Sequence, residues 1–144
     1  MNQEQRSELG LGENMPQVNI HQSPNAPAAI GPYSQAVSYA GVVYCSGQIA
    51  LTPEGEDKTK ASVAEQTAQA LDNLQAVLKA SGSDLSCVMK VNISLVDMSD
   101  FSEVNGVYER YFSHHKPARA CVAVAALPRG ASIEIECIAA IRES

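Results

Sequence analysis

The spacing of apolar residues along the chain predicts one domain in which short strands are interspersed with two helices. Apolar residues three and four positions apart indicate helices over residues 62–80 and 100–112, and shorter apolar or alternating runs indicate strands. The strand candidates are six short runs: residues 18–20, 36–39, 42–51, 89–95, 118–125 and 132–142. The order of these elements predicts an α+β fold in which one sheet packs against the two helices.

The two predicted helices have clear apolar stripes, and the first also has end signals. Ser62 can cap the first helix, with Glu65 three residues later, and Gly82 can end it. Its predicted inner face consists of Ala64, Ala68, Leu71, Leu74 and Leu78. The predicted inner face of the second helix consists of Val104, Val107, Tyr108, Tyr111 and Phe112.

The last two strand candidates, which residues 127–130 join in a predicted hairpin, indicate an oligomer. In the final strand, the face expected to meet the helices carries Ile133, Ile135, Cys137, Ala139 and Ile141, and the other carries Glu134, Glu136, Ile138 and Ala140. Residues 120–125 are apolar on both faces. Because two helices can cover only one face of a sheet, we expect further copies of the chain to cover the other. A site on that face would then lie at or near a subunit interface.

The first 17 residues are expected to form a flexible extension ahead of a domain that spans residues 18–144. They are polar, lack periodicity and contain glycine and proline breakers. Their acidic residues make them a poor mitochondrial transit peptide. The four cysteines show no Cys-x-x-Cys spacing, so we expect reduced thiols and a cytoplasmic protein, with a mitochondrial location as the less favoured alternative.

Charge and composition argue against several classes of partner. The 144 residues carry a net charge of −6, which opposes binding to a nucleic-acid backbone. No run of 18 apolar residues is present, so no membrane span is expected. The adjacent His114 and His115 lack further ligands at metal-binding spacing, and we therefore expect no metal.

Arg119 and Glu134 are the strongest candidates for chemistry. Arg119 opens an otherwise apolar strand, and a guanidinium is suited to gripping a carboxylate with two parallel hydrogen bonds. Glu134 lies in the last strand, where a carboxylate can hold a water or move a proton. In the predicted hairpin the two residues are offset by four positions, about 13 Å. That spacing suits two groups that flank a small molecule, although a structural salt bridge across the sheet stays open.

Three further segments carry weaker signals. Tyr33 lies in a tight Gly-Pro-Tyr-Ser turn, and Ser46 precedes a glycine that interrupts an apolar strand, which indicates a bulge or a close backbone approach. Asn105 lies on the second helix and can face a cleft. Taken alone, each is better explained as an ordinary turn, strand or solvated helix residue.

Together these segments resemble the RidA (YjgF) family of reactive-intermediate deaminases. The resemblance extends over about residues 18–142, and its last motif is close to a family signature. The motifs are residues 26–36 (APAAIGPYSQA), 46–49 (SGQI), 97–101 (DMSDF) with 104–105 (VN), and 117–122 (PARACV) through 127–130 (LPRG) to 133–136 (IEIE).

The resemblance implies a chorismate-mutase-like α+β fold with a mixed sheet of about six strands, and a homotrimer with a site in each cleft between subunits. It implies an enzyme without a cofactor, a hydrolase of C–N bonds. Its substrates would be enamines and imines, such as 2-aminoacrylate, 2-iminobutanoate and 2-iminopropanoate, which pyridoxal-phosphate enzymes release. The products would be 2-keto acids and ammonia.

The resemblance also assigns roles to individual residues. It implies that Arg119 binds the substrate carboxylate and that Glu134 positions the attacking water. The residues implied to line the cleft are Tyr33, Ser46, Asn105 and Cys121, with Ser46 and Cys121 acting through their backbones. The chain departs from the family pattern at residues 124–127, where many members carry an arginine before the leucine, and this affects the rim of the cleft.

Two other functions remain open at this point. One is a non-catalytic trimer that binds small carboxylates or serves as a stress-related chaperone, which would need Arg119 but not Glu134. The other is a ribonuclease or translation inhibitor, functions attached to relatives in this family. The acidic balance and the lack of a paired His–His or His–Lys site oppose it.

Overall fold

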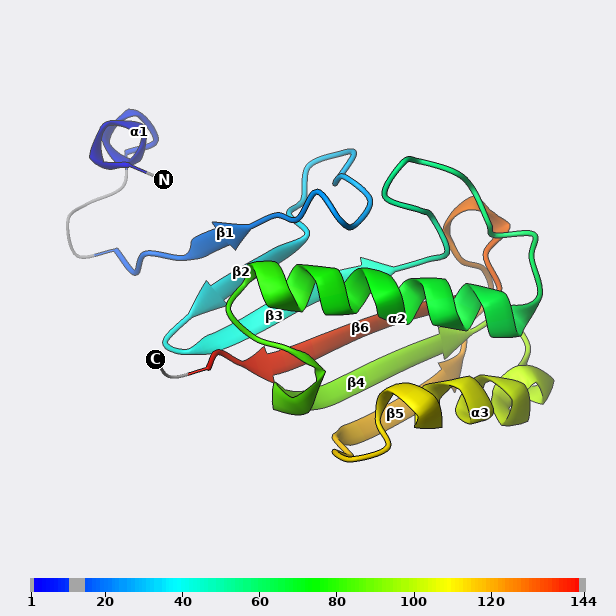
Figure 1. Cartoon of the computed structure of the whole chain (residues 1–144). Helices are drawn as coiled ribbons and strands as arrows, with labels where there is room; N and C mark the ends of the chain where they lie inside the picture. The colour runs from blue at the N-terminus through cyan, green and yellow to red at the C-terminus, as the bar shows by residue number, and fades with distance from the viewer. Residues whose placement is uncertain (1, 11–14, 143–144) are drawn as a thin grey trace.

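The computed structural model describes residues 2–10 and 15–142 and shows a six-stranded sheet with two helices on one face (Figure 1). The strands are β1 (Asn19–His21), β2 (Ala36–Tyr39), β3 (Val42–Gln48), β4 (Val88–Leu95), β5 (Ala118–Ala123) and β6 (Ile133–Ala140). The helices are α1 (Gln3–Glu8), α2 (Val63–Ala80) and α3 (Phe101–Tyr111), with short 3₁₀ turns η1 (Leu85–Cys87), η2 (Met98–Asp100) and η3 (Pro128–Gly130). The predicted α+β class is confirmed.

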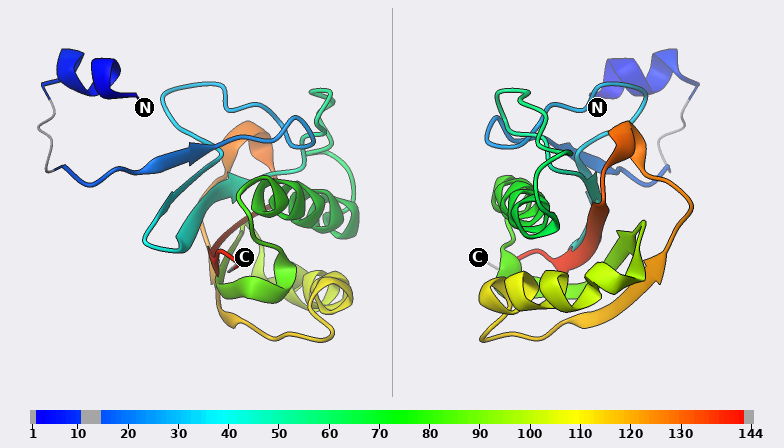
Figure 2. Two further views of the ribbon diagram at one scale, coloured as in Figure 1. Left: turned by 60° about the vertical axis from the view of Figure 1, so that its left-hand side comes forward. Right: turned by 90° about the vertical axis from the view of Figure 1, so that its right-hand side faces the viewer.

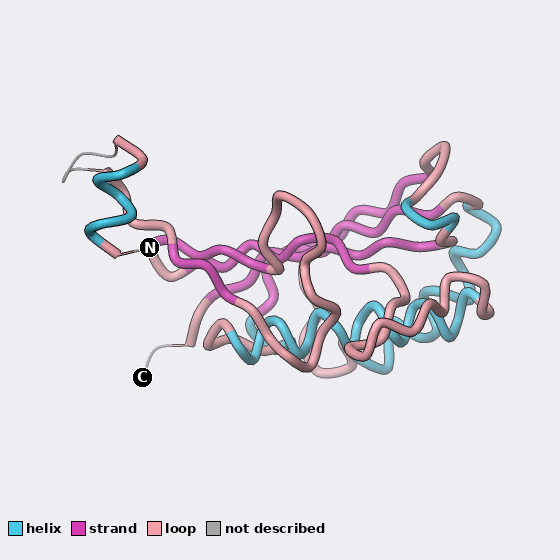
Figure 3. Tube along the Cα trace, turned by 90° about the horizontal axis from the view of Figure 1, so that it is seen from above, coloured by secondary structure: helices cyan, strands magenta, loops and turns pink. Residues whose placement is uncertain are grey.

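The strands form one layer and α2 and α3 form the second (Figure 3). The strand order is β1-β2-β3-β6-β4-β5, and every neighbouring pair is antiparallel except β4 and β5, which are parallel. The predicted mixed sheet is therefore confirmed. Within the described residues, no helix is long and apolar enough to cross a bilayer.

The predicted hairpin between the last two strands is wrong. β6 does not pair with β5 but inserts between β3 and β4, and β5 lies at the edge of the sheet. The unit β4–α3–β5 is a crossover between parallel strands, and such a crossover returns its second strand beside the first with the helix packed on one face. The inner residues of β6 are almost fully buried, as expected of a central strand, whereas β5 is largely exposed.

The face of the sheet that meets the helices is the predicted one. Four alternate residues of β6 are between 0% and 3% exposed: Ile133, Ile135, Cys137 and Ala139. They join Val43 and Cys45 of β3 and Val91, Ile93 and Leu95 of β4 in the core. The opposite face of β6 carries Glu134, Glu136, Ile138 and Ala140, and no element among the described residues covers it.

Helix α2 begins and ends where the sequence predicts, but its buried face is wider than predicted. Ser62 Oγ accepts a hydrogen bond from the Glu65 N–H at 3.2 Å, and Gly82 follows the helix with φ +83°. The three predicted leucines are buried, whereas Ala64 and Ala68 are only half-buried. Three polar residues are buried instead: Gln66, Thr67 and Asn73.

The buried polar side chains of α2 hold neighbouring loops in place. Asn73 Nδ2 donates to the carbonyl of Leu51 at 2.8 Å, and Gln66 Oε1 accepts from the Ser132 N–H at 3.0 Å. These loops lead out of β3 and into β6. A buried polar group is tolerated because it is hydrogen-bonded, and each of these bonds also fixes a segment of backbone.

Helix α3 presents most of its predicted inner face. Val104, Val107, Tyr108 and Phe112 are buried. Tyr111 is only half-buried, because its hydroxyl reaches α2 and donates to Asp72 Oδ1 at 2.9 Å.

The N-terminal segment contains a short helix that the sequence analysis did not predict. Helix α1 lies outside the two layers of the domain (Figure 2). It is stabilised locally, because Asn2 Oδ1 accepts from the Gln5 N–H at 2.8 Å and Gln5 Oε1 accepts from the Asn2 N–H at 3.0 Å. Residues 11–14 of the predicted extension lie outside the described residues, and the boundary at residue 17 stays a prediction.

Candidate functional site

Arg119 and Asn105 come together between β5 and α3. Arg119 Nη1 donates a hydrogen bond to Asn105 Oδ1 at 2.7 Å. The guanidinium carbon lies 4.7 Å from the ring centroid of Tyr108 and 5.5 Å from that of Phe101. An aromatic face attracts a cation, so the guanidinium is held by one hydrogen bond and two rings. This arrangement leaves other guanidinium donors for a ligand carboxylate.

A cavity of about 420 Å³ adjoins this guanidinium. It is lined by Asn105, Tyr108, Glu109, Phe112, Lys116, Pro117 and Arg119. Cys121 follows two positions along β5, on the same face as Arg119, and is half-buried against the core. Burial raises the pKa of the Cys121 thiol, and the nearby Arg119 only partly opposes this. The thiol therefore stays protonated at neutral pH, which does not favour a nucleophile.

Tyr33, Ser46 and Glu134 come together at a second cavity, of about 540 Å³. It lies between the loops that precede β2 and follow β3 and the start of β6. Ser46 Oγ donates to the carbonyl of Ser34 at 2.6 Å, so this hydroxyl is already engaged. The implied role of Ser46 through its backbone stays a prediction.

Gly47 and Glu134 are in close contact in this second cavity. A Cβ atom on Gly47 would lie 2.8 Å from Glu134 Cδ and Oε1, so any larger residue would displace the carboxylate. The pairing of β3 with β6 shifts register between Cys45 and Gln48. The bulge or close approach that the sequence predicts at this glycine is therefore confirmed.

The surroundings of Glu134 favour the protonated form of its carboxyl group more than water does. Burial raises the pKa of the Glu134 carboxyl, and the neighbouring Glu136 raises it further. A carboxyl group whose pKa moves toward neutrality accepts and returns protons more readily at neutral pH.

Gln35 fixes the loop that carries Tyr33. The buried Gln35 side chain accepts from the Ser23 N–H at 2.6 Å and donates to the carbonyl of Pro27 at 2.7 Å. The Tyr33 N–H donates to the carbonyl of Gly31 at 2.9 Å, and Gly31 has φ +130°. The tight turn presents the tyrosine ring, which is 56% exposed, at the mouth of the cavity.

The two groups lie on opposite faces of the sheet within one chain. Arg119 is paired with Val91, which is buried beneath the helices, whereas Glu134 is paired with Ser94 on the other face. Paired residues in adjacent strands point to the same side. The expectation that Arg119 and Glu134 flank one small molecule in the predicted hairpin is therefore wrong for a single chain. A salt bridge between them does not form either, because Arg119 bonds Asn105 instead.

Sequence reasoning missed the aromatic support of Arg119. Phe101, Asn105 and Tyr108 are four and three residues apart and so share one face of α3. That spacing was available in the sequence, but its meaning depends on β5 lying beneath α3. Among the described residues, no group of three or more His, Cys, Asp or Glu side chains is placed to bind a metal ion.

Comparisons with known proteins place the chain in a known family. The model of the family described as Endoribonuclease L-PSP matches residues 23–141. The chain is 51% identical to the mouse protein named 2-iminobutanoate/2-iminopropanoate deaminase over 114 residues, which is 79% of this chain and 84% of that protein.

Two solved structures show the same fold. Yeast Mmf1 is 40% identical, with a TM-score of 0.85 over 88% of this chain and all of that one. E. coli TdcF with bound serine is 38% identical, with a TM-score of 0.81 over 86% of this chain and 99% of that one.

Proposed function

The chain belongs to the Endoribonuclease L-PSP family, which is the RidA (YjgF) family, and from this premise we propose that it hydrolyses reactive imines to 2-keto acids and ammonia. Its substrates are 2-iminobutanoate, 2-iminopropanoate and the enamines that tautomerise to them, as the name of the mouse relative indicates. The observation that carries the proposal is a pair of functional groups. The Arg119 guanidinium is oriented by Asn105 and has free donors for a carboxylate, and Glu134 has a raised pKa.

Arg119 binds the α-carboxylate of the imine. Its guanidinium offers a planar pair of N–H donors that match the two oxygens of a carboxylate. Asn105 and the ring of Tyr108 already fix its direction, so little side-chain freedom is lost when the ligand binds. The serine bound to TdcF, an amino acid with a carboxylate and an amino group, supports a ligand of this class.

Glu134 assists the addition of water and the departure of ammonia. As the water oxygen bonds to the imine carbon, Glu134 takes one of its protons and the C=N double bond becomes a C–N single bond. Glu134 then returns the proton to the nitrogen, which gives a carbinolamine. Glu134 next takes the remaining proton of the new hydroxyl group and passes it to the nitrogen. The C–N bond breaks as the C=O bond forms, and ammonia leaves. A raised pKa suits both directions of this transfer.

The active unit in this proposal is a homotrimer in which one chain supplies Arg119 and its neighbour supplies Glu134. The two groups lie on opposite faces of one sheet, and no helix or strand among the described residues covers the face that carries Glu134. A head-to-tail interface places the two different surfaces against each other and closes into a ring. Each of the three clefts then holds one complete site.

The activity is tested by timing imine decay in the presence of the protein. An amino-acid oxidase generates imines from alanine and from 2-aminobutyrate, and semicarbazide traps what remains. Wild-type protein should accelerate decay, whereas Arg119→Ala should lose most of the acceleration while the oligomer stays intact. Full turnover by Arg119→Ala would refute the assignment of the carboxylate clamp.

The shared site is tested by mixing two inactive variants. Arg119→Ala and Glu134→Gln each damage every site, but after random mixing in equal amounts about a quarter of all sites combine an intact Arg119 with an intact Glu134. Unfolding and refolding the variants together should therefore restore about a quarter of wild-type activity. No recovery in confirmed mixed oligomers would show that the two groups do not share a cleft.

A carboxylate-binding protein without catalysis is the second candidate, because TdcF holds serine. Glu134→Gln separates the two functions: in the proposed enzyme it keeps ligand affinity and loses turnover. Equal turnover by Glu134→Gln and wild type would favour the binder. Cleavage of RNA by repurified wild type, lost in Arg119→Ala, would instead support the activity that the family description names.

A further inference from the structure

Arg129 is the positively charged residue on the wall of the Glu134 cavity. Among the described residues that line this cavity, Arg129 and Glu134 are the charged ones. The remaining wall is mostly apolar or small, and the cavity of about 540 Å³ is far larger than a three-carbon imine needs. The proposed reaction uses Glu134 and assigns no role to Arg129.

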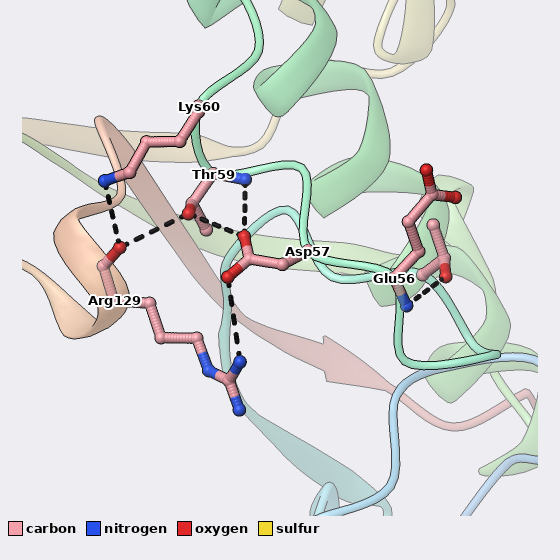
Figure 4. Close-up of polar contacts among 6 residues, drawn as sticks. Glu56, Asp57, Thr59, Lys60 and Arg129 are labelled. Atoms are coloured by element: carbon pink, nitrogen blue, oxygen red, sulfur yellow. Dashed lines mark hydrogen bonds and ion pairs between the residues drawn. The ribbon is translucent and has the colours of Figure 1, made fainter.

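The backbone of Arg129 is held in an uncommon conformation. Its φ of +57° and ψ of +20° lie in the left-handed region, which a residue other than glycine adopts only where its surroundings require it. The Arg129 carbonyl accepts from Thr59 Oγ1 at 3.3 Å and from Lys60 Nζ at 3.4 Å (Figure 4). The loop after β3 therefore fixes where the Arg129 side chain begins.

The guanidinium of Arg129 is only weakly engaged within the chain. Its Nη1 lies 3.6 Å from Asp57 Oδ2, longer than a charge-assisted hydrogen bond, and the two side chains are 53% and 41% exposed. Ion pairs of this kind contribute little to stability. A ligand carboxylate that accepts two N–H bonds is a better partner for this guanidinium.

The Asp57 carboxylate keeps its main hydrogen bonds and its charge without Arg129. Its Oδ1 accepts from the Thr59 hydroxyl at 2.6 Å and from the Thr59 N–H at 2.8 Å (Figure 4). These two bonds are the main cause of the lowered pKa of Asp57, and Arg129 adds less. Arg129 can therefore move from Asp57 to a ligand while Asp57 stays charged and hydrogen-bonded.

We propose that Arg129 is a second anion-binding residue, which extends the range of substrates to imino acids with a second carboxylate on the side chain. The inference rests on the proposed function. Arg119 of one chain binds the α-carboxylate, Glu134 of its neighbour serves the imine carbon, and Arg129 beside Glu134 binds the distal carboxylate. Asp57 competes with the distal carboxylate for Arg129 and so weakens the preference for dicarboxylic imines.

The test compares two imines in the same assay. An oxidase acting on aspartate supplies the dicarboxylic imine, and one acting on alanine supplies the monocarboxylic imine. The measured quantity is the ratio of their kcat/KM values. In Arg129→Ala this ratio should fall at least about tenfold, which corresponds to about 1.4 kcal/mol. In Asp57→Asn, which frees the guanidinium and keeps an acceptor for Thr59, the ratio should rise.

Two further variants test whether backbone strain at residue 129, or the loss of any exposed arginine, could change the ratio. Arg129→Gly suits the left-handed backbone and should lower the ratio as much as Arg129→Ala does. Arg142→Ala removes another exposed arginine, which pairs with Asp84 and does not line this cavity, and should leave the ratio unchanged. Thermal unfolding of each variant should be measured to check that it is folded.

The outcomes separate this inference from the proposed function. If wild type accelerates both imines but Arg129→Ala and Arg129→Gly keep the wild-type ratio, the role of Arg129 is refuted and the deaminase stands. If Asp57→Asn lowers the ratio, the competition between Asp57 and ligand is refuted. If wild type accelerates neither imine, the proposed function fails and this inference fails with it.

Discussion

The contact between Gly47 and Glu134 gives a way to move the proposed catalytic carboxylate without removing it. Gly47→Ala adds one methyl group that would lie 2.8 Å from Glu134 Cδ and Oε1 and 2.9 Å from Cγ. Gly47 has no left-handed backbone, so alanine fits its conformation. The glutamate is the group that must move, because its end is flexible and the strand is not.

The size of the displacement sets the expected effect. Carbon atoms in ordinary contact lie about 3.5–4.0 Å apart, so the carboxylate must shift by roughly 0.7 Å or more. Misplacement of a reacting group by about 1 Å can lower a rate about 100-fold. We therefore expect kcat/KM to fall about 10- to 100-fold, which corresponds to about 1.4–2.8 kcal/mol. The free energy of unfolding should change by less than about 1 kcal/mol, because alanine also restricts the unfolded chain.

The assay is imine decay at a series of substrate concentrations, together with urea unfolding of each variant. Gly106→Ala is the matched control, because its Cβ would meet nothing within 4 Å. It lies in α3, where alanine is favoured over glycine by about 1 kcal/mol, so it should stabilise the fold and leave turnover unchanged. The double variant Gly47→Ala/Glu134→Ala tests the route of the effect, since two residues in contact should show non-additive losses.

Two results would refute the reasoning. One is a folded Gly47→Ala protein with wild-type turnover, which would mean that the position of Glu134 does not matter. The other is a Gly47→Ala substitution that lowers turnover equally in wild type and in the Glu134→Ala background. In that case the methyl group acts through something other than the carboxylate.

Four other predictions concern the pKa of Glu134, its effect on stability, the orientation of Arg119 and the packing of the core. Because Glu136 contributes to the raised pKa of Glu134, turnover should fall as pH drops through that pKa, and Glu136→Gln should move this acid limb of the pH–rate profile to lower pH. Because the pKa of Glu134 is raised in the folded protein, its carboxyl group stabilises the fold below the unfolded pKa, and this stability is lost as pH rises through the folded pKa. At neutral pH the charged carboxylate therefore costs stability, and Glu134→Gln, which carries no charge, should unfold at a higher temperature than wild type. Asn105→Ala removes the acceptor that orients Arg119, and substrate titration should show about a tenfold loss in kcat/KM, mainly through KM. Leu71→Ala, at a fully buried position of α2, should lower the free energy of unfolding by about 2–5 kcal/mol in urea titrations, with KM unchanged.

Each of these predictions has an outcome that contradicts it. An acid limb that stays in place in Glu136→Gln would assign it to another group, and a Glu134→Gln protein less stable than wild type would contradict the direction of the pKa shift. A wild-type KM in Asn105→Ala would mean that the aromatic rings alone orient Arg119. A loss of stability below about 1 kcal/mol in Leu71→Ala would show that its surroundings collapse to fill the space.

Local patterns in the sequence were sufficient to predict the elements of the domain. The end signals of α2 at Ser62 and Gly82 are confirmed, and so is the alternation that turns Ile133 and Ile135 toward the helices. The buried Asn73 was not predicted, because its role is to bond a loop that lies far away in the sequence. Helix periodicity reports which face is apolar, but it does not report a polar residue that is buried for a hydrogen bond.

The pairing of the last strands was not predictable from local patterns. The connection between β5 and β6 is short enough for a hairpin, and only the crossover through α3 decides that β5 follows β4 in parallel. This one difference decides the site, because the register of a strand determines the face on which a side chain lies. The resemblance selected Arg119 and Glu134, but their positions on opposite faces emerge only from the pairing with β4.

In the proposed trimer, the two halves of each site would already be formed in the separate chains before assembly. Arg119 is already oriented by Asn105 and Tyr108, and Glu134 already packs against the backbone of Gly47. Among the described residues, the groups that contact Arg119 are different from the one that contacts Glu134. A site preorganised in this way needs little rearrangement when substrate arrives, which is the condition under which modest acid–base help accelerates a reaction that already proceeds in water. Imine hydrolysis is such a reaction, so in the proposed trimer the two groups would accelerate it across an interface. We expect loss of that interface to remove activity without unfolding the chain.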